Sequence, residues 1–227
     1  MIDYTNTLNA LLGKIDIDAT GATDASELVA AAERVVKSGA TAVLVSPAAV
    51  HTIWAWLENK GVSIFARQKV DEQKTRRGAD ADSFYMKLVA ELNSTLKKGA
   101  DGIVLQADGD AAGLMSVLFS VRADLFFGKK LILAVDLGKT DALSWGALFL
   151  NLKKCDADGL FLTAGAAAEP DVAGRLFGML NAWDAGFDGM LYFDLGRPGD
   201  VEGAFRLIGK MRPELKNRVR FFIKNRA

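Results

Sequence analysis

The sequence predicts an α/β protein whose eight parallel strands close into a (β/α)8 TIM barrel. Three observations favour this fold. Strand-like and helix-like segments alternate along the whole chain, which is typical of a parallel sheet. Eight strand-like segments fit into about 210 residues, a spacing that favours closure of the sheet into a barrel. Half of the 227 residues are hydrophobic, which is enough to fill a large core.

The expected strands are short apolar runs, and a helix-like segment follows each of them except the last. The strands are predicted at residues 14–18, 41–46, 62–68, 101–108, 130–138, 158–163, 189–195 and 219–224. The helices are predicted at about residues 24–38, 47–60, 80–98, 110–127, 140–154, 169–185 and 199–211. No linker or low-complexity stretch interrupts the series, so residues 1–227 are interpreted as one domain.

Local signals mark several ends of these helices. Thr23 and Asp24 are capping candidates for the first helix, and Ser46 can cap the second, with Pro47 at its first position. Helices are expected to end at C-cap glycines in three turns that precede strands: Ser38–Ala40, Lys98–Ala100 and Ala157–Gly159.

No helix-like segment follows the eighth strand, because the sequence ends at Ala227. We expect an N-terminal helix over residues 1–12 to take the place of this missing last helix. Its apolar side chains fall on one face, and Gly13 ends it directly before strand one. The residues of that face are Tyr4, Leu8, Leu11 and Leu12.

Composition narrows the classes of partner. Lysine plus arginine and aspartate plus glutamate each number 28, and the basic residues are scattered, so neither nucleic acid nor a membrane surface is an expected partner. No window approaches about 18 uninterrupted apolar residues, so no membrane span is expected. The single cysteine, Cys155, excludes an intramolecular disulfide and suits a reducing compartment. Residues 1–13 carry no signal-peptide pattern, so a cytoplasmic location is expected.

Short motifs along most of the chain resemble deoxyribose-phosphate aldolase and its relatives. The opening IDIDATGATDASELVAAAERVVKSGATAVLVSPAAV (15–50) is similar to that family's first strand, first helix and second strand. Lys98–Asp101 (KGAD) lies where the family has Gly-Ala-Asp before strand four. Ala157–Gly165 (ADGLFLTAG) parallels its strand six, and Arg197 falls near its Gly-Gly-x-Arg turn after strand seven. The resemblance implies an aldolase-type barrel.

The same resemblance shows what the chain lacks. The family's chemistry needs a Schiff-base lysine on strand six, a second lysine on strand seven and an aspartate on strand four. These positions are Phe161, Tyr192 (or Leu191, depending on alignment) and Val104 here. No lysine occurs between residues 154 and 210, so the family mechanism cannot operate.

Phosphate recognition is also weakened relative to the family. Barrels of this type often hold phosphate with glycine-rich loops after strands seven and eight. The first of these loops, Asp194–Arg197, has one glycine and an added carboxylate, and the second, Lys224–Arg226, has none. The cations of these loops can still offer positive charge to an anion.

Polar side chains are expected to gather at one end of the barrel. Side chains along a strand alternate between the helices and the barrel interior, and active sites of such barrels lie at the carboxyl ends of the strands. The carboxylates Asp18, Asp136 and Asp194 are the expected catalytic groups for proton transfer. The expected substrate-binding residues are Arg67, Lys69, Gln106, Asp108, Thr163, Arg197 and Lys224.

Structural interpretations compete with these roles. Strands one and eight become neighbours when the barrel closes, so Asp16 and Arg220 are expected to form a buried structural pair. For the three rim carboxylates and Lys224, ligand contact and structural pairing both stay open. Clustered carboxylates also suit Mg²⁺, although no ligand spacing marks such a site and no other cofactor is expected. The long, cation-bearing loop Lys69–Asp82 is either a flap over an anionic ligand or a solvated loop.

Two functions stay open on this basis. One is an enzyme that binds a small anionic metabolite, a sugar phosphate or keto-acid, and uses carboxylates for lyase or isomerase chemistry. The other is a non-catalytic barrel that serves as a binding or assembly subunit, which the missing family residues favour. Helices four to six (110–127, 140–154, 169–185) are apolar beyond one stripe, which predicts a homodimer through them.

Overall fold

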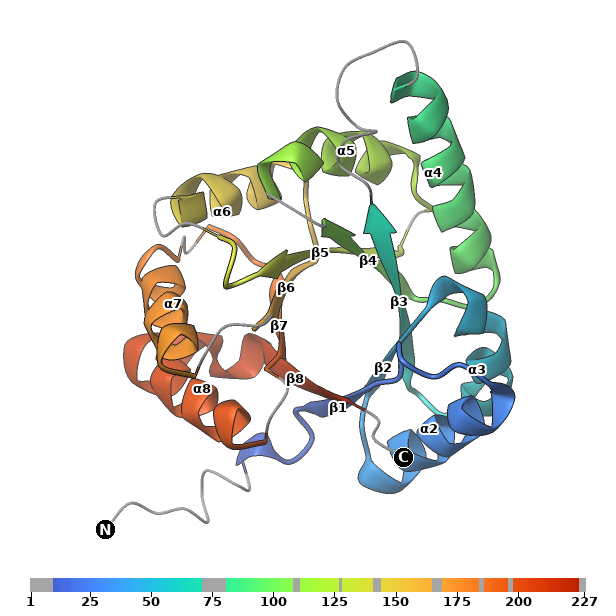
Figure 1. Cartoon of the computed structure of the whole chain (residues 1–227), viewed down its shortest axis with the longest axis horizontal. Coiled ribbons are helices and arrows are strands. Elements are labelled where there is room, and N and C mark those ends of the chain that lie inside the picture. The colour runs from blue at the N-terminus through green and yellow to red at the C-terminus, as the bar shows by residue number, and fades with distance from the viewer. Residues whose placement is uncertain are drawn as a thin grey trace.

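The computed structural model describes residues 10–70, 81–107, 111–126, 128–140, 144–164, 169–183, 186–195 and 198–224. Its eight strands are all parallel and close into a barrel in the order β1 to β8 (Figure 1), which confirms the predicted fold. The strands are β1 Ile15–Asp18, β2 Ala42–Val45, β3 Ser63–Val70, β4 Gly102–Ala107, β5 Lys130–Asp136, β6 Gly159–Thr163, β7 Met190–Asp194 and β8 Val219–Lys224.

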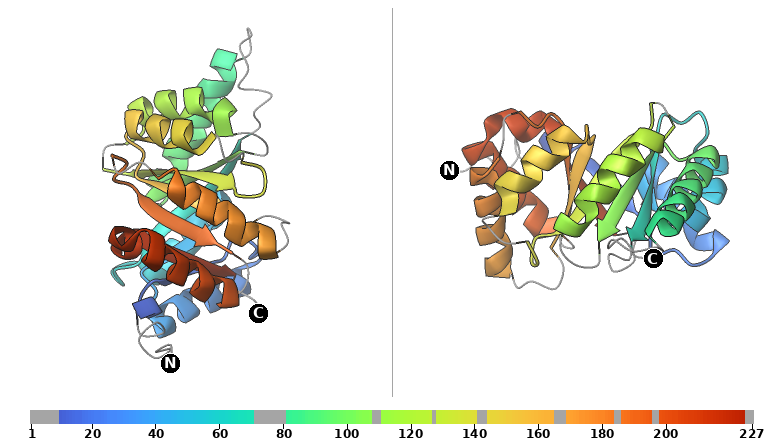
Figure 2. Two further views of the ribbon diagram at one scale, coloured as in Figure 1. Left: turned by 90° about the vertical axis from the view of Figure 1, so that its left-hand side faces the viewer. Right: turned by 90° about the horizontal axis from the view of Figure 1, so that it is seen from above.

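Helices surround the barrel on its outside (Figure 2) and alternate with the strands along the chain. They are α2 Ala25–Ser38, α3 Val50–Leu57, α4 Ala81–Lys97, α5 Ala111–Asp124, α6 Trp145–Lys154, α7 Glu169–Asn181 and α8 Pro198–Met211. Short 3₁₀ helices, η1 Pro47–Ala49 and η4 Pro213–Arg218, precede α3 and β8. Sequence reasoning merged η1 with α3 and did not predict η4.

The strand alternation divides the buried side chains into two cores. The larger core lies between the strands and the helices, and the smaller one fills the interior of the barrel. The interior core contains Ala42, Leu44, Phe65, Val104, Ile132, Ala134, Phe161, Tyr192 and Phe222. The Phe161 ring lies 5.3 Å from that of Phe222 and 6.3 Å from that of Tyr192, so aromatic side chains close the barrel beneath its mouth.

Three local predictions about helix ends hold, and two need correction. The Asp24 carboxylate accepts a hydrogen bond from the Glu27 N–H at 2.9 Å, Gly39 ends α2 with a φ of 67°, and Gly99 follows α4 with a φ of 113°. Ser46 precedes η1 but makes no capping hydrogen bond. Gly159 is not a helix cap: it begins β6, and the left-handed backbone after α6 falls on Asp156 with a φ of 52°.

Glycine at 159 is required for a different reason, namely close packing inside the barrel. A Cβ atom there would lie 2.8 Å from the Tyr192 ring and 2.9 Å from the Met190 carbonyl oxygen. The position therefore fits no larger side chain, although its backbone is ordinary for a strand.

The expected N-terminal helix lies mostly outside the described residues. Ala10 and Leu11 are helical, and Leu11 is buried in the outer core, as the prediction required. Leu12, which was expected on the same apolar face, is exposed. The chain turns at Gly13 with a φ of 77° and enters β1.

Large apolar side chains are exposed on the side of the barrel that carries α5, α6 and α7. Phe119, Phe126, Leu150 and Phe177 are between 39% and 49% exposed. Val36, Trp56 and Met86, on α2, α3 and α4, are exposed as well. Within the described part of the chain, no helix has the length and apolar character needed to cross a membrane.

Candidate functional site

The carboxyl ends of the strands surround two adjoining cavities at one end of the barrel. The larger has a volume of about 630 Å³ and opens among the ends of β1, β2, β3, β4 and β8. The smaller, of about 260 Å³, lies toward β5, β6 and β7. Arg67, Gln106 and Lys224 line both, so the two cavities form one continuous mouth. This arrangement agrees with the inward-facing polar set that strand alternation predicts.

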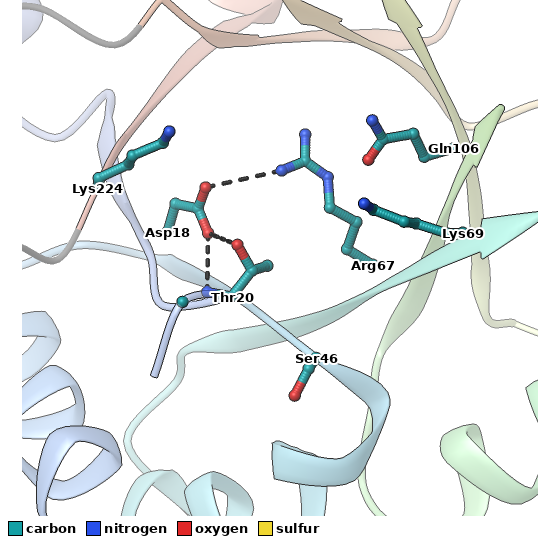
Figure 3. Close-up of a pocket in the computed structure, with 8 residues that line it drawn as sticks. Asp18, Thr20, Ser46, Arg67, Lys69, Gln106 and Lys224 are labelled. Carbon is teal, nitrogen blue, oxygen red and sulfur yellow. Dashed lines mark hydrogen bonds and ion pairs between the residues drawn. The ribbon is translucent and has the colours of Figure 1, made fainter. Parts of the chain in front are cut away.

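Asp18 ends β1 and lies at the wall of the larger cavity (Figure 3). The residue is 3% exposed. Its Oδ1 atom accepts hydrogen bonds from the Thr20 N–H at 2.9 Å and the Thr20 hydroxyl at 2.6 Å. Its Oδ2 atom is buried and has no hydrogen-bond partner among the described residues. One oxygen thus holds the carboxylate in place, and the other keeps unused capacity to accept a hydrogen bond.

Arg67 extends from β3 into the centre of the mouth, and its side chain is 13% exposed. Its Nη1 atom lies 3.7 Å from Oδ2 of Asp18 and 4.0 Å from Oδ2 of Asp194. The guanidinium carbon lies 4.9 Å from the centre of the Phe161 ring, a cation–π contact that orients the group. The Nε and Nη2 atoms are buried without a hydrogen-bond partner in the part of the chain that the structure describes.

The smaller cavity brings together three predicted residues from neighbouring strands. Asp136, Thr163 and Asp194 line it, and the strand register places Thr163 between the two carboxylates. The Asp136 Oδ1 atom accepts a hydrogen bond from the Gly138 N–H at 2.7 Å. The Thr163 hydroxyl lies 3.5 Å from the Val135 carbonyl oxygen. Two carboxylates and a hydroxyl therefore share one small, polar space.

A second arginine–aspartate pair lies deeper and is fully bonded. Arg220 donates from both Nε and Nη2 to the Asp16 carboxylate, the latter at 2.7 Å. Asp16 also accepts from the backbone N–H groups of Thr41 at 3.1 Å and Ala42 at 2.8 Å. Asp16 is fully buried. These contacts confirm the predicted pair and give it a structural role, because they satisfy both charges within the barrel.

Burial shifts the pKa of two side chains below the mouth. Burial is the main reason that the pKa of the Tyr192 hydroxyl rises to about 12, so this group stays protonated at neutral pH. Burial, with a smaller contribution from the Arg220 charge, lowers the pKa of Lys14. Tyr192 lies in the aromatic core beneath the mouth, so its hydroxyl adds no ionised group there.

The structure brings eight of the ten predicted site residues to this mouth. Asp108 and Arg197 lie outside the described residues, as do residues 71–80 of the expected flap. Sequence reasoning missed Thr20 and Gly21, which also line the larger cavity. The Asp-x-Thr pattern directly after a strand was the available signal, because a threonine hydroxyl two residues on can bond the aspartate.

The described residues contain no group of three or more histidine, cysteine, aspartate or glutamate side chains placed to hold a metal ion. Asp18 and Asp194 are separated by the Arg67 side chain, which contacts both. The predicted carboxylate cluster is therefore arranged around a cation of the protein itself.

No protein-family model matches this chain, and no curated protein matches its sequence. Solved structures do share its fold. The deoxyribose-phosphate aldolase from Aeropyrum pernix superposes with a TM-score of 0.68 at 11% identity, over 96% of this chain and 91% of that chain. The aldolase QR15 gives a TM-score of 0.65 at 14% identity, over 98% and 92%. This chain has the fold of the class I aldolase barrels.

The likeness extends to other barrels of this kind. A dihydrodipicolinate synthase from Acinetobacter baumannii, in complex with pyruvate, gives a TM-score of 0.58 at 16% identity, over 93% of this chain and 69% of that chain. At these identities the similarity shows the fold alone. The three positions at which the aldolase resemblance implies catalytic residues are Phe161, Tyr192 and Val104, all in the interior core. A Schiff-base mechanism at these positions is therefore excluded.

Proposed function

We propose that the mouth of the barrel binds a small anionic metabolite, a sugar phosphate or keto-acid, and that its carboxylates move protons in a lyase or isomerase reaction. The observation that carries this proposal is the composition of the larger cavity. Arg67, Lys69 and Lys224 line a space of about 630 Å³ together with Asp18, whose Oδ2 atom has no described hydrogen-bond partner. This volume falls in the range of ordinary small-molecule sites.

The cations have a binding role and an electrostatic one. Lys69 and Lys224 are exposed at the rim, where they attract an anion and hold its outer end. Arg67 lies deeper and offers N–H donors to an oxygen on which negative charge develops during proton removal. Without a Schiff base to withdraw electrons, the reaction depends on this electrostatic stabilisation.

The carboxylates supply the proton acceptor. The Asp18 Oδ2 atom accepts no hydrogen bond from the described residues, and Asp136 and Asp194 line the adjoining cavity. A general base must reach the proton it removes within hydrogen-bond distance, and each of these groups borders the space that the ligand would occupy. Asp136 is the best placed for a test, because no contact of the deeper ion pair depends on it.

A thermal-shift screen tests the binding. A ligand at 100 times its dissociation constant adds about 2.7 kcal/mol of stability, and each kcal/mol raises the Tm of a chain this size by roughly 2–4 °C. We expect a shift with sugar phosphates or keto-acids, pyruvate among them. Lys224→Gln should lose this shift, whereas the matched control Lys37→Gln, on the exposed surface of α2, should keep it.

Proton transfer is tested separately from binding. A keto-acid that binds is incubated with the protein in D₂O, and NMR follows deuterium incorporation next to the carbonyl group. We expect incorporation with the wild-type protein and its loss in Asp136→Asn. The control Asp188→Asn makes the same change at an exposed residue before β7, at the opposite end of the barrel. Binding without incorporation would contradict an enzymatic role.

The second candidate function is a non-catalytic binding or assembly subunit. The exposed apolar side chains on α5, α6 and α7 favour it, because a surface of this kind usually contacts another protein surface. A second copy of this chain is the proposed partner. Light scattering at micromolar concentration should give the mass of a dimer, and Leu150→Lys with Phe177→Lys should give that of a monomer. A monomeric wild-type protein would refute this assembly.

A further inference from the structure

The guanidinium of Arg67 has one edge in contact with carboxylates and one edge without described hydrogen-bond partners. Its Nη1 atom faces Asp18 and Asp194, whereas Nε and Nη2, which form the opposite edge, are buried without hydrogen-bond partners among the described residues. Figure 3 shows Asp18 on one side of the group and Gln106 and Lys69 on the other, and all four residues line the same cavity. Buried N–H donors without acceptors lower the stability of the folded state, and a ligand oxygen at this edge would supply the missing acceptor.

Arg220 shows how the same edge is used elsewhere in the barrel. Its Nε and Nη2 atoms both donate to one carboxylate, that of Asp16, in a bidentate arrangement. Arg67 presents these same two atoms one layer higher, and the protein supplies no described carboxylate to them. The guanidinium carbon lies over the Phe161 ring, 4.9 Å from its centre, and this contact restrains the group.

We propose that the Nε/Nη2 edge of Arg67 binds the carboxylate of a small hydroxy- or keto-acid, and that the mouth selects carboxylates over phosphate esters. This inference rests on the proposed function and names its substrate class. A planar carboxylate matches the two parallel N–H bonds of the edge.

Charge at the mouth favours a monoanion. Among the described residues that line the two cavities, three are cations and three are carboxylates, so their charges sum to zero. Arg67 itself lies between two of the carboxylates. A phosphate ester carries a charge of about −1.5 to −2 at neutral pH, and it would place that charge beside Asp18 and Asp194. A carboxylate adds only one negative charge.

Space at the edge favours a flat group as well. The Nε and Nη2 atoms are covered by protein, so a ligand must displace a neighbouring side chain to reach them. Lys69 and Gln106 lie on that side and have flexible side chains (Figure 3). A planar carboxylate requires a smaller displacement than a tetrahedral phosphate.

Calorimetric titration with matched anions tests the selection. Glycerate, lactate and pyruvate are compared with glycerol 3-phosphate and inorganic phosphate. We expect at least one carboxylate to bind ten times more tightly than either phosphate compound. Binding of phosphates without carboxylates would overturn this inference and leave the proposed anion site intact. Binding of no compound would overturn both.

Variants test the role of the edge. Arg67→Lys keeps the positive charge but removes the bidentate edge, and it should weaken carboxylate binding at least tenfold. Arg206→Lys makes the same change on α8, outside the barrel, and should leave the affinity unchanged. Equal affinities in the wild-type protein and Arg67→Lys would overturn the inference.

A spectroscopic measurement keeps the test valid if Arg67→Lys does not fold. The Arg67 Nε–H resonance of the wild-type protein is assigned through bonds and followed during titration with the tightest carboxylate. We expect a downfield shift that saturates with the calorimetric dissociation constant. A resonance that stays unchanged at saturation would overturn the inference.

Discussion

The barrel contains two arginine–aspartate pairs that differ in how completely they are bonded. In the lower pair, Arg220 and Asp16 make two hydrogen bonds to each other, and the Asp16 carboxylate accepts two more from backbone N–H groups. In the upper pair, Arg67 and Asp18 approach only to 3.7 Å, and each has buried polar atoms without a described hydrogen-bond partner. The same two residue types therefore serve structure when their bonds are complete and leave capacity for a ligand when they are not.

The largest expected effect comes from the same substitution at the two aspartates of β1. Asp16→Asn removes the carboxylate charge to which Arg220 makes its bidentate contacts, and breaking a buried pair in this way costs about 3–5 kcal/mol. Asp18→Asn keeps its threonine contacts, and Arg67 still has Asp194 at 4.0 Å. Its expected cost is about 1 kcal/mol.

Urea denaturation monitored by circular dichroism measures both variants under one set of conditions. The comparison is between the two losses in the free energy of unfolding. Equal losses would contradict the distinction between a structural lower pair and an open upper pair.

The lower pair could be predicted from the sequence because it depends only on the order of the strands and on barrel closure. Closure of the barrel makes β1 and β8 neighbours, and alternation turns Asp16 and Arg220 to the same side. The alternation of strands and helices predicted the closure itself. The same logic placed most of the described mouth residues at the carboxyl ends of their strands.

The upper pair was not predictable in the same way. Arg67 lies on β3, which pairs with β2 and β4 and with neither β1 nor β7. Its contacts with Asp18 and Asp194 therefore cross the barrel interior, and they depend on the side-chain rotamer and on what fills the space beneath. Phe161 fills that space and supports the guanidinium. Strand alternation predicts which side of the sheet a side chain faces, but not how far it extends or which residues it contacts.

Gly159 is another residue whose role could not be predicted from the local sequence. The Ala-Asp-Gly sequence resembled the other helix-ending turns, but the left-handed residue is Asp156, and Gly159 is small because the Tyr192 ring lies against it. A local motif records a backbone preference, whereas this glycine is required by a contact with another strand.

The next largest effect concerns the buried Tyr192 hydroxyl and the free energy of unfolding at alkaline pH. The pKa of Tyr192 is raised to about 12, mainly by burial, against an ordinary value of 10. A raised folded-state pKa contributes stability that is complete below pH 10 and is lost as the pH rises toward 12, because the unfolded chain ionises first. The loss should be on the order of 2 kcal/mol.

Tyr192→Phe provides the control for this pH dependence. The variant keeps the ring and removes the ionisable group, so the free energy of unfolding should fall less steeply between pH 10 and 12 than in the wild-type protein. Other alkaline groups titrate in both proteins and cancel in the difference. Parallel curves would show that water reaches the Tyr192 hydroxyl within the aromatic core beneath the mouth.

The smallest expected effect on stability is that of replacing Arg67, measured against the same substitution at Arg220. Arg220→Met leaves the buried Asp16 charge uncompensated and should be strongly destabilising. Arg67→Met removes buried N–H donors that have no described acceptor, but it also takes away the cation beside the buried Asp18 carboxylate. Asp18 keeps both Thr20 hydrogen bonds, and the contact that is lost is 3.7 Å long, so the loss in the free energy of unfolding should be smaller than in Arg220→Met. Anion binding should be lost even so, and denaturation and calorimetry on one preparation separate the two quantities. A residue whose removal costs less stability than that of Arg220, yet abolishes binding, is kept for the ligand. A loss of stability in Arg67→Met as large as that in Arg220→Met would instead make the upper pair part of the same scaffold as the lower one.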